Sequence, residues 1–193
     1  FEAQIMDWSD DVSYSVHDIE DAIVANQISV PEINTDIHGI YRNLKENFLL
    51  DVTETEAQAA LNRLQALPFW PIDFDGQHKG LAKLKDSTSQ LIGRFVVYSE
   101  KATREKYGNS DLTRFEADLV IPREQLVEVS LLKAIASYYL IEAPTAAPKY
   151  AKQREVIFAL VEEILASSPD VLDPIYLDDW AAAESEKSKL RVV

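Results

Sequence analysis

The chain has 193 residues, of which 33 are acidic and 19 basic, so that its formal net charge is −14. This acidic balance disfavours nucleic-acid binding, which requires clustered lysine and arginine, and no apolar run approaches the ~20 residues that cross a membrane. Cysteine is absent and glycine occurs five times, which excludes disulfides, iron–sulfur clusters, cysteine-ligated zinc and glycine-rich nucleotide loops.

The first predicted element is a strongly amphipathic helix over residues 2–25. At 100° per residue, its apolar residues fall within an arc of about 80°. These residues are Ile5, Trp8, Val12, Val16, Ile19 and Ile23. Polar residues occupy the opposite side, namely Asp7, Asp10, Tyr14, Asp18 and Asp21. The pattern predicts that one face enters the core while the other meets solvent or a ligand.

Apolar periodicity predicts further helices after a loop over 26–36. Thr53 followed by Glu56 is a capping-box pattern that opens one of them, and Pro122 suits the first position of another. These helices span 37–50 (helix or turn), 53–67, 79–106, 122–142, 149–167 and 178–193. The apolar side of the fifth consists of Val156, Ile157, Leu160, Val161, Ile164 and Leu165.

Two segments interrupt the helical pattern. Residues 115–121 predict one short strand, placed in a β hairpin, and the alanine- and proline-rich residues 143–148 predict a linker. The predicted fold class is therefore all-α (mainly α), a helical bundle with one short β hairpin or strand.

Both ends of the sequence lie inside helical patterns. Phe1 leads directly into a helix, and 189–193 has no glycine or proline cap, so we expect a fragment cut within helices at both ends. Such a fragment should expose apolar surface at Trp8, Val192 and Val193, whereas a complete module should not. No signal peptide is recognisable, and we expect a cytoplasmic protein.

Asp10, Tyr14 and Asp18 are the candidate functional residues of the first helix. Their spacing of four places them on one face, each about 40° from the last. A carboxylate can bind a divalent cation, a phenol can contact phosphate oxygens or a sugar, and a second carboxylate can accept from a sugar hydroxyl. Together they suit a small phosphorylated molecule. The alternative is a solvated acidic face, which is the default for such a helix.

Lys133 and Arg94 are charged residues in otherwise apolar stretches. Such a charge must extend to solvent, pair with a carboxylate or meet an anionic ligand. We favour extension or pairing for Lys133, with a triphosphate contact as the alternative, and Arg94 has the same alternatives.

The dipeptide His17–Asp18 has the letters of a metal-binding His-Asp motif but not its geometry, because neighbours on a helix diverge by about 100°. We expect His17 to be a surface or partly buried structural residue. His38 and His78 flank turn-like segments and are expected at the surface.

Residues 9–21 resemble a motif of a known enzyme family. They read Ser-Asp-Asp-Val-Ser-Tyr-Ser-Val-His-Asp-Ile-Glu-Asp. The closing helix of the catalytic core in bacterial deoxyguanosine triphosphate triphosphohydrolases, which are HD-domain phosphohydrolases, is similar: Ala-Asp-Asp-(Ile/Val)-x-Tyr-x-x-x-Asp-(Leu/Val/Ile)-Glu-Asp. Ser9 replaces the small alanine. Weaker similarities cover most of the chain, at 91–95, 112–119, 131–133 and 190–193.

The resemblance implies roles for the three candidate residues. Asp10 matches the last metal ligand of the HD site, Tyr14 a residue along the triphosphate and sugar, and Asp18 a residue that reads the deoxyribose 3′-hydroxyl. The family's other ligands, a histidine and a His-Asp pair, lie upstream of this motif, and no histidine here stands in their place. Residues 1–25 would then be the last helix of the catalytic core and 26–193 the C-terminal helical domain.

The implied reaction is hydrolysis of a deoxynucleoside triphosphate to deoxynucleoside and triphosphate by water activated on manganese, magnesium or a similar divalent metal. With one ligand, the chain alone is predicted to be inactive. The resemblance also implies a homo-oligomeric parent protein, and the expected partner is the deoxynucleotide, without membrane or nucleic acid. The alternative function is a stand-alone acidic helical interaction module without catalysis.

Overall fold

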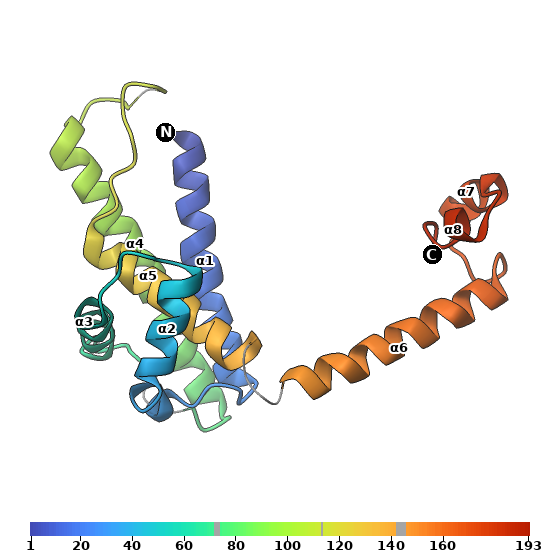
Figure 1. Cartoon of the computed structure of the whole chain (residues 1–193). Helices are drawn as coiled ribbons and strands as arrows, with labels where there is room; N and C mark the ends of the chain where they lie inside the picture. Colours follow the sequence, from blue (N-terminus) through green and yellow to red (C-terminus); the bar gives the residue numbers. More distant parts are fainter. Residues whose placement is uncertain (72–73, 113, 142–145) are drawn as a thin grey trace. The chain divides into compact units, whose positions relative to one another are not determined.

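The computed structural model describes residues 1–71, 74–112, 114–141 and 146–193 (Figure 1). The chain divides into two compact units, residues 1–142 and 143–193. All regular elements in the described ranges are helical, which confirms the prediction of a mainly α chain. None of the helices described there is long and apolar enough to cross a membrane.

The α-helices of the first unit are arranged around α5. They are α1 (Glu2–Val24), α2 (Ile37–Asn47), α3 (Glu54–Gln65), α4 (His78–Tyr107) and α5 (Arg123–Ala136). The short 3-10 helix η1 (Val30–Asn34) lies within the predicted loop before α2, and the π-helical turn η2 (Ser137–Ile141) continues α5. α5 packs against α1, α2 and α3, and α1 also packs against α4.

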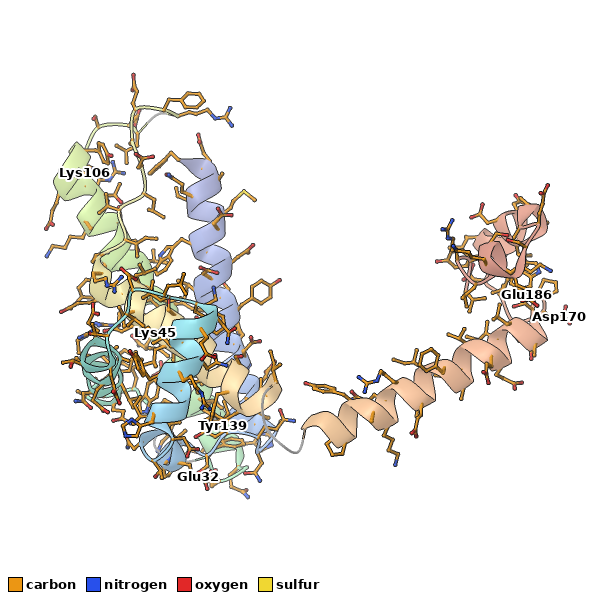
Figure 2. All side chains as sticks on the ribbon, viewed as in Figure 1. Glu32, Lys45, Lys106, Tyr139, Asp170 and Glu186 are labelled. Atoms are coloured by element: carbon orange, nitrogen blue, oxygen red, sulfur yellow. The ribbon has the colours of Figure 1, made fainter. Side chains whose placement is uncertain are left out.

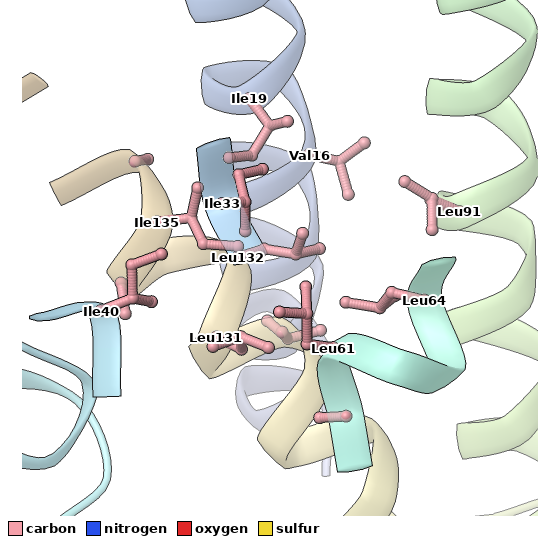
Figure 3. Packing of buried hydrophobic residues seen from close by; sticks show 14 of the residues in the cluster. Val16, Ile19, Ile33, Ile40, Leu61, Leu64, Leu91, Leu131, Leu132 and Ile135 are labelled. Carbon is pink, nitrogen blue, oxygen red and sulfur yellow. The ribbon is translucent and has the colours of Figure 1, made fainter. Parts of the chain in front are cut away.

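α5 supplies the centre of the hydrophobic core. Its Leu131 and Leu132 are fully buried. Figure 3 shows them among side chains of the surrounding helices, including Ile19 of α1, Ile40 of α2 and Leu61 of α3. Burial of each side chain of this size contributes about 2 kcal/mol, so this layer of contacts holds α1, α2 and α3 on α5.

The predicted apolar side of α1 is buried from Trp8 onward. Trp8 is 6% exposed and packs edge-on against Phe95 of α4, with the ring centroids 6.4 Å apart. Ile5, predicted in the same arc, is 40% exposed. The expectation that Trp8 would be exposed is therefore wrong, because α4 covers it, whereas Val193 is 37% exposed.

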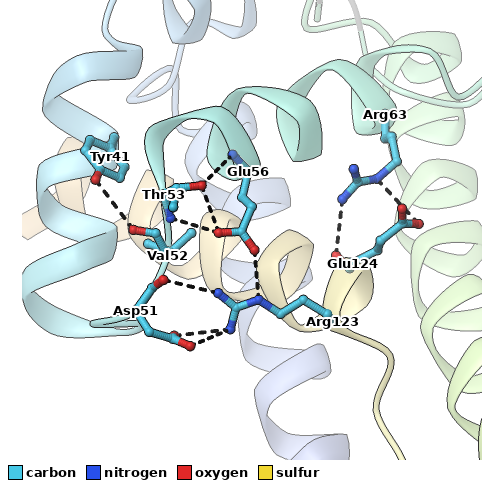
Figure 4. A network of polar contacts seen from close by, with 8 residues as sticks. All are labelled: Tyr41, Asp51, Val52, Thr53, Glu56, Arg63, Arg123 and Glu124. Atoms are coloured by element: carbon cyan, nitrogen blue, oxygen red, sulfur yellow. Dashed lines mark hydrogen bonds and ion pairs between the residues drawn. The ribbon is translucent and has the colours of Figure 1, made fainter.

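Thr53 opens α3 with the predicted capping box. The Glu56 N–H donates to Thr53 Oγ1, and the Thr53 N–H donates to the Glu56 carboxylate at 2.9 Å. Arg123 donates to the other Glu56 oxygen at 3.0 Å and also to Asp51 (Figure 4). The hydrogen bonds from Arg123 and Thr53 hold the pKa of Glu56 at about 2. This network ties the start of α3 to the start of α5, where Pro122 is the N-cap rather than the first helical residue.

The predicted strand over 115–121 is wrong, and this segment is irregular. Phe115 has a φ of 71° and is 94% exposed. The N–H of Leu119 donates to the Gln4 side chain, and the N–H of Val120 donates to Thr103 Oγ1, each at 3.0 Å. Side chains of α1 and α4 thus bind backbone donors that a strand would use in a ladder.

The second unit contains α6 (Ala146–Ser167), the 3-10 turn η3 (Pro174–Tyr176), α7 (Leu177–Ala182) and α8 (Glu186–Lys189). The predicted helix over 149–167 is confirmed. The predicted helix over 178–193 is wrong, because extended backbone at Ala183 ends α7 and Ser185 caps a separate α8. The predicted linker lies outside the described residues at 143–145, and α6 already begins at Ala146.

Candidate functional site

The outer face of α1 carries the three candidate residues. Asp10, Tyr14 and Asp18 are all exposed, Tyr14 by 67%. The side chains of Asp10 and Tyr14 have no hydrogen bond, ion pair or ring contact with any residue that the structure describes. Figure 1 shows α1 at the edge of the first unit. The three side chains therefore lie on one exposed face of α1, as their spacing predicts.

The surroundings of Asp18 raise the pKa of its carboxyl group. Partial burial raises the pKa of the Asp18 carboxyl, the charge of Asp21 raises it further, and His17 lowers it. The crowding of carboxylates makes this end of the face a poor site for an anion and a better one for a hydroxyl donor.

The described residues do not form a complete metal site. Among them, no three histidine, aspartate or glutamate side chains are close enough together to hold a metal ion. The exposed carboxylate of Asp10 offers one oxygen ligand of the kind that magnesium and manganese accept. The donor set therefore fits one position of a divalent site and no more.

Lys133 pairs with a carboxylate of α1, which confirms one of the two favoured interpretations. Its Nζ donates to Asp11 Oδ1 at 2.7 Å and lies 5.6 Å from the centre of the Phe48 ring. Lys133 is 29% and Asp11 48% exposed. Asp11 follows Asp10 and is about 20° beyond Asp18 around the helix. The pair therefore borders the open face on its α5 side.

Arg94 is held in a cluster with a fully buried carboxylate. Glu128 of α5 is completely buried and accepts from Arg94 at 3.0 and 3.2 Å and from Arg63 Nε at 2.7 Å. Arg94 is 15% exposed and also stacks on the Tyr98 ring, 4.8 Å from its centre. The Arg94 guanidinium thus pairs with Glu128 within the core of the unit, where α3, α4 and α5 meet.

Sequence reasoning missed Asp11, Glu128 and a second buried acid, Glu20. Glu20 of α1 is 2% exposed, accepts from Thr88 Oγ1 at 2.6 Å and pairs with Lys85. Burial alone would raise the pKa of Glu20, but the hydrogen bonds from Lys85 and Thr88 lower it overall. The position of Glu20 in the sequence could have indicated its burial, because Glu20 follows Ile19 on the side of α1 that faces α4.

The histidines lie at the surface, as predicted. His17 is 54% exposed, with its Nδ1 3.8 Å from Glu20, and His38 is 84% exposed and pairs with Glu54 at 2.6 Å. His78 is exposed at the start of α4. None of the three approaches Asp10 to form a group of metal ligands within the described residues.

A cavity of about 560 Å³ lies between the first turns of α1 and the last turns of α4. Apolar side chains such as Ile5, Trp8, Val96 and Leu119 line it, and Ser9 lies at its wall. Asp10, Tyr14 and Asp18 are not among the lining residues. The cavity and the open acidic face are therefore separate features of α1.

Comparison with known proteins gives matches over the whole chain. A deoxyguanosinetriphosphate triphosphohydrolase-like protein of Streptomyces coelicolor is 42% identical, with 100% of this chain and 46% of the relative covered. The protein of the same description from Bifidobacterium longum is 35% identical, covering 99% and 41%, and that from Vibrio vulnificus is 25% identical, covering 100% and 39%. The chain thus spans less than half the length of these relatives.

Residues 119–193 also match the phosphohydrolase-associated domain. No solved structure matches the chain. The resemblance that the motif over 9–21 predicted is confirmed: the chain is a relative of the deoxyguanosinetriphosphate triphosphohydrolase-like proteins, consistent with a C-terminal part of such a protein.

Proposed function

We propose that the chain is part of a metal-dependent deoxynucleoside triphosphate triphosphohydrolase of the dGTP type. The observation that carries this proposal is that the residues of the family motif lie together on one exposed face of a helix. Asp10, Tyr14 and Asp18 match the motif and lie exposed on one face of α1, with nothing described covering them. The proposal is supported further by the 42% identity of the whole chain to a relative named as triphosphohydrolase-like.

In this proposal Asp10 supplies one carboxylate ligand to a divalent metal, and the remaining ligands come from outside the chain. When bound, the metal lowers the pKa of water and offsets charge that develops on phosphorus oxygens. Asp10 suits this role because its carboxylate is exposed and has no described partner that it would have to release.

Tyr14 and Asp18 would orient the nucleotide on the same face. The Tyr14 ring offers an apolar surface for the sugar and a hydroxyl that donates to a phosphate oxygen. Asp18, one turn further, would accept a hydrogen bond from the 3′-hydroxyl. Its acidic neighbourhood favours this hydroxyl over a phosphate, which gives the ligand a direction along the helix.

Lys133 and Arg94 have different prospects as phosphate contacts. Lys133 lies at the border of the face and is partly exposed, so that its ammonium could turn from Asp11 toward a phosphate. Arg94 would have to leave the buried Glu128, which would cost the protein its internal ion pair. We therefore include Lys133 in the proposed site as a secondary contact and assign Arg94 a structural role.

The test measures triphosphate release from each deoxynucleoside triphosphate by the full-length protein with manganese or magnesium. Asp10→Ala should reduce the rate by more than about a hundredfold, because a lost ligand weakens metal binding. Asp86→Asn on α4 is the matched control, an exposed acid away from the face, and should change nothing. The 193-residue chain alone should release no triphosphate.

Two results would count against the proposal. Absence of release from any nucleotide by the full-length protein would favour the non-catalytic interaction module. Equal rates for the native protein and Asp10→Ala would remove Asp10 from the metal site even if the protein is active.

A further inference from the structure

An open cavity of the first unit lies between the turn after α3 and the middle of α4, and we name it the α4 groove. Its volume is about 440 Å³. Leu67 and Phe69 line it from the turn after α3, and Val97 and Tyr98 line it from α4. All its lining residues fall within residues 1–142, so the groove is a feature of the first unit by itself. Its volume and mainly apolar lining are typical of sites for small molecules.

Gly93 leaves the wall of the α4 groove without a side chain at the middle of α4. The helix has 30 residues, and Figure 2 shows side chains standing out from it as far as Lys106 near its end. Glycine is less favourable than alanine inside a helix. A Cβ added at Gly93 would have no non-neighbouring atom of the described residues within 4 Å. Close packing within the described structure therefore does not explain the glycine, whereas a ligand that lies against the helix backbone would.

Arg94 supplies the charge of the α4 groove. Among the described residues that line the groove, Arg94 alone is charged. Its Nε and Nη2 donate to Glu128, whereas its Nη1 has no hydrogen bond to a described residue and is not enclosed. Arg63 shares the same buried carboxylate, so two positive charges and one negative charge leave this cluster with a net charge of +1. The exposed Glu124 approaches the cluster at Arg63 Nε, 4.0 Å away. The Nη1 group of Arg94 is therefore available to an anion.

We propose that the α4 groove binds a small aromatic carboxylate. The carboxylate accepts hydrogen bonds from Arg94 Nη1, while the other two guanidinium nitrogens keep their present bonds. Gln90 also lines the groove, and its side-chain amide is a second donor. A flat ring fits against Gly93, beside the aromatic rings of Phe69 and Tyr98.

The charged and aromatic parts of the α4 groove are held next to each other before a ligand arrives. The Arg94 guanidinium lies 4.8 Å from the centre of the Tyr98 ring and is anchored by Glu128. A site whose groups are already in place loses less freedom on binding. Because the charge that faces the groove is positive while the chain as a whole carries −14, charge complementarity selects an anion at this place. This inference does not depend on the proposed activity.

The first test titrates the 193-residue chain with 2-naphthoate by calorimetry. The native chain should bind one equivalent with a dissociation constant below about 1 mM. 2-Naphthylmethanol has the same ring without the charge. It should bind at least about tenfold more weakly, because it lacks the carboxylate that pairs with Arg94.

Two leucine substitutions on α4 test the place of binding. Gly93→Leu fills the groove and should weaken the binding of 2-naphthoate at least about tenfold. Ala82→Leu adds a leucine at an exposed position about three turns earlier on the same helix and should leave the dissociation constant unchanged. Leucine is a good helix former, so the circular dichroism of both variants should match that of the native chain.

Nuclear magnetic resonance locates the ligand without a substitution. 2-Naphthoate should shift the amide signals of Gly93 and Val97 and leave that of Gly39 on α2 unchanged. Absence of saturable binding, or equal binding of the two naphthalenes, would overturn the proposal. So would shifts confined to Ile5 and Trp8 in the cavity between α1 and α4, or binding that Gly93→Leu leaves intact. Loss of binding in the full-length protein would also overturn it, because the groove would then be covered there.

Discussion

Glu128→Gln is expected to destabilise the first unit by about 3 kcal/mol. Glu128 is fully buried and accepts from Arg63 at 2.7 Å and from Arg94 at 3.0 Å. The substitution keeps the size of the side chain but leaves two guanidinium charges without their buried counter-ion. Removing one partner of a buried pair typically costs about 3–5 kcal/mol. The lower end applies here because Arg63 and Arg94 are 30% and 15% exposed, so that water partly solvates them.

Native-state hydrogen exchange of the α5 amides is the appropriate assay. The chain has two units, and a single unfolding curve would combine their transitions, whereas exchange reports the opening of α5 itself. Glu124→Gln is the matched control, because Glu124 is 66% exposed and 4.0 Å from Arg63. Its effect should stay below about 0.5 kcal/mol. Equal protection losses for the two variants would refute the claim that the buried carboxylate holds α3 and α4 on α5.

Three further outcomes follow from the contacts described above. The pKa of Glu56 of about 2 lies below its ordinary value of 4.5. The stability that the Glu56 carboxylate contributes is therefore present above about pH 5 and is lost as the pH falls toward 2. Arg123→Met should raise the pKa of Glu56, which nuclear magnetic resonance titration would measure. Phe95→Ala should destabilise the first unit by about 3–5 kcal/mol in the same exchange assay, because the ring is fully buried against Trp8. Asp11→Asn and Lys133→Met should each loosen α1, and a double-mutant cycle should show coupling of about 0.5–1 kcal/mol; additive effects would mean that their 2.7 Å contact contributes nothing.

Local patterns predicted the α-helices of the first unit because the relevant signals lie within a few residues of each other. The apolar arc of residues 2–25 is formed by one helix, and the capping box needs Thr53 and Glu56 alone. The strand prediction for residues 115–121 failed for the opposite reason. Their apolar content resembles a strand, but their backbone N–H groups bind distant side chains. The N–H of Leu119 binds a side chain 115 residues away in sequence, and the N–H of Val120 binds one 17 residues away. No local pattern contains that information.

In the candidate site too, the features with a local sequence signal were predicted and the long-range contacts were not. The spacing of Asp10, Tyr14 and Asp18 predicted a shared face, and all three are exposed on α1. For Lys133, an isolated charge in an apolar segment predicted extension to solvent or pairing with a carboxylate, with an anionic ligand as the alternative. The fold alone identifies the partner as Asp11, 122 residues away in sequence. Glu128 was missed because a glutamate among apolar residues gives the same pattern whether it reaches solvent or is buried.

Glu128 and Lys133 of α5 explain how the fold sets the direction of the candidate face. Glu128 binds α3 and α4, and Lys133 binds Asp11 of α1. Apolar packing alone allows a helix to rotate slightly with little loss, whereas an ion pair has a defined partner and length. Because Asp11 is held by Lys133, the rotation of α1 is fixed, and Asp10 is directed away from the core. The orientation of the proposed metal ligand is therefore set by a contact made one residue along the same helix.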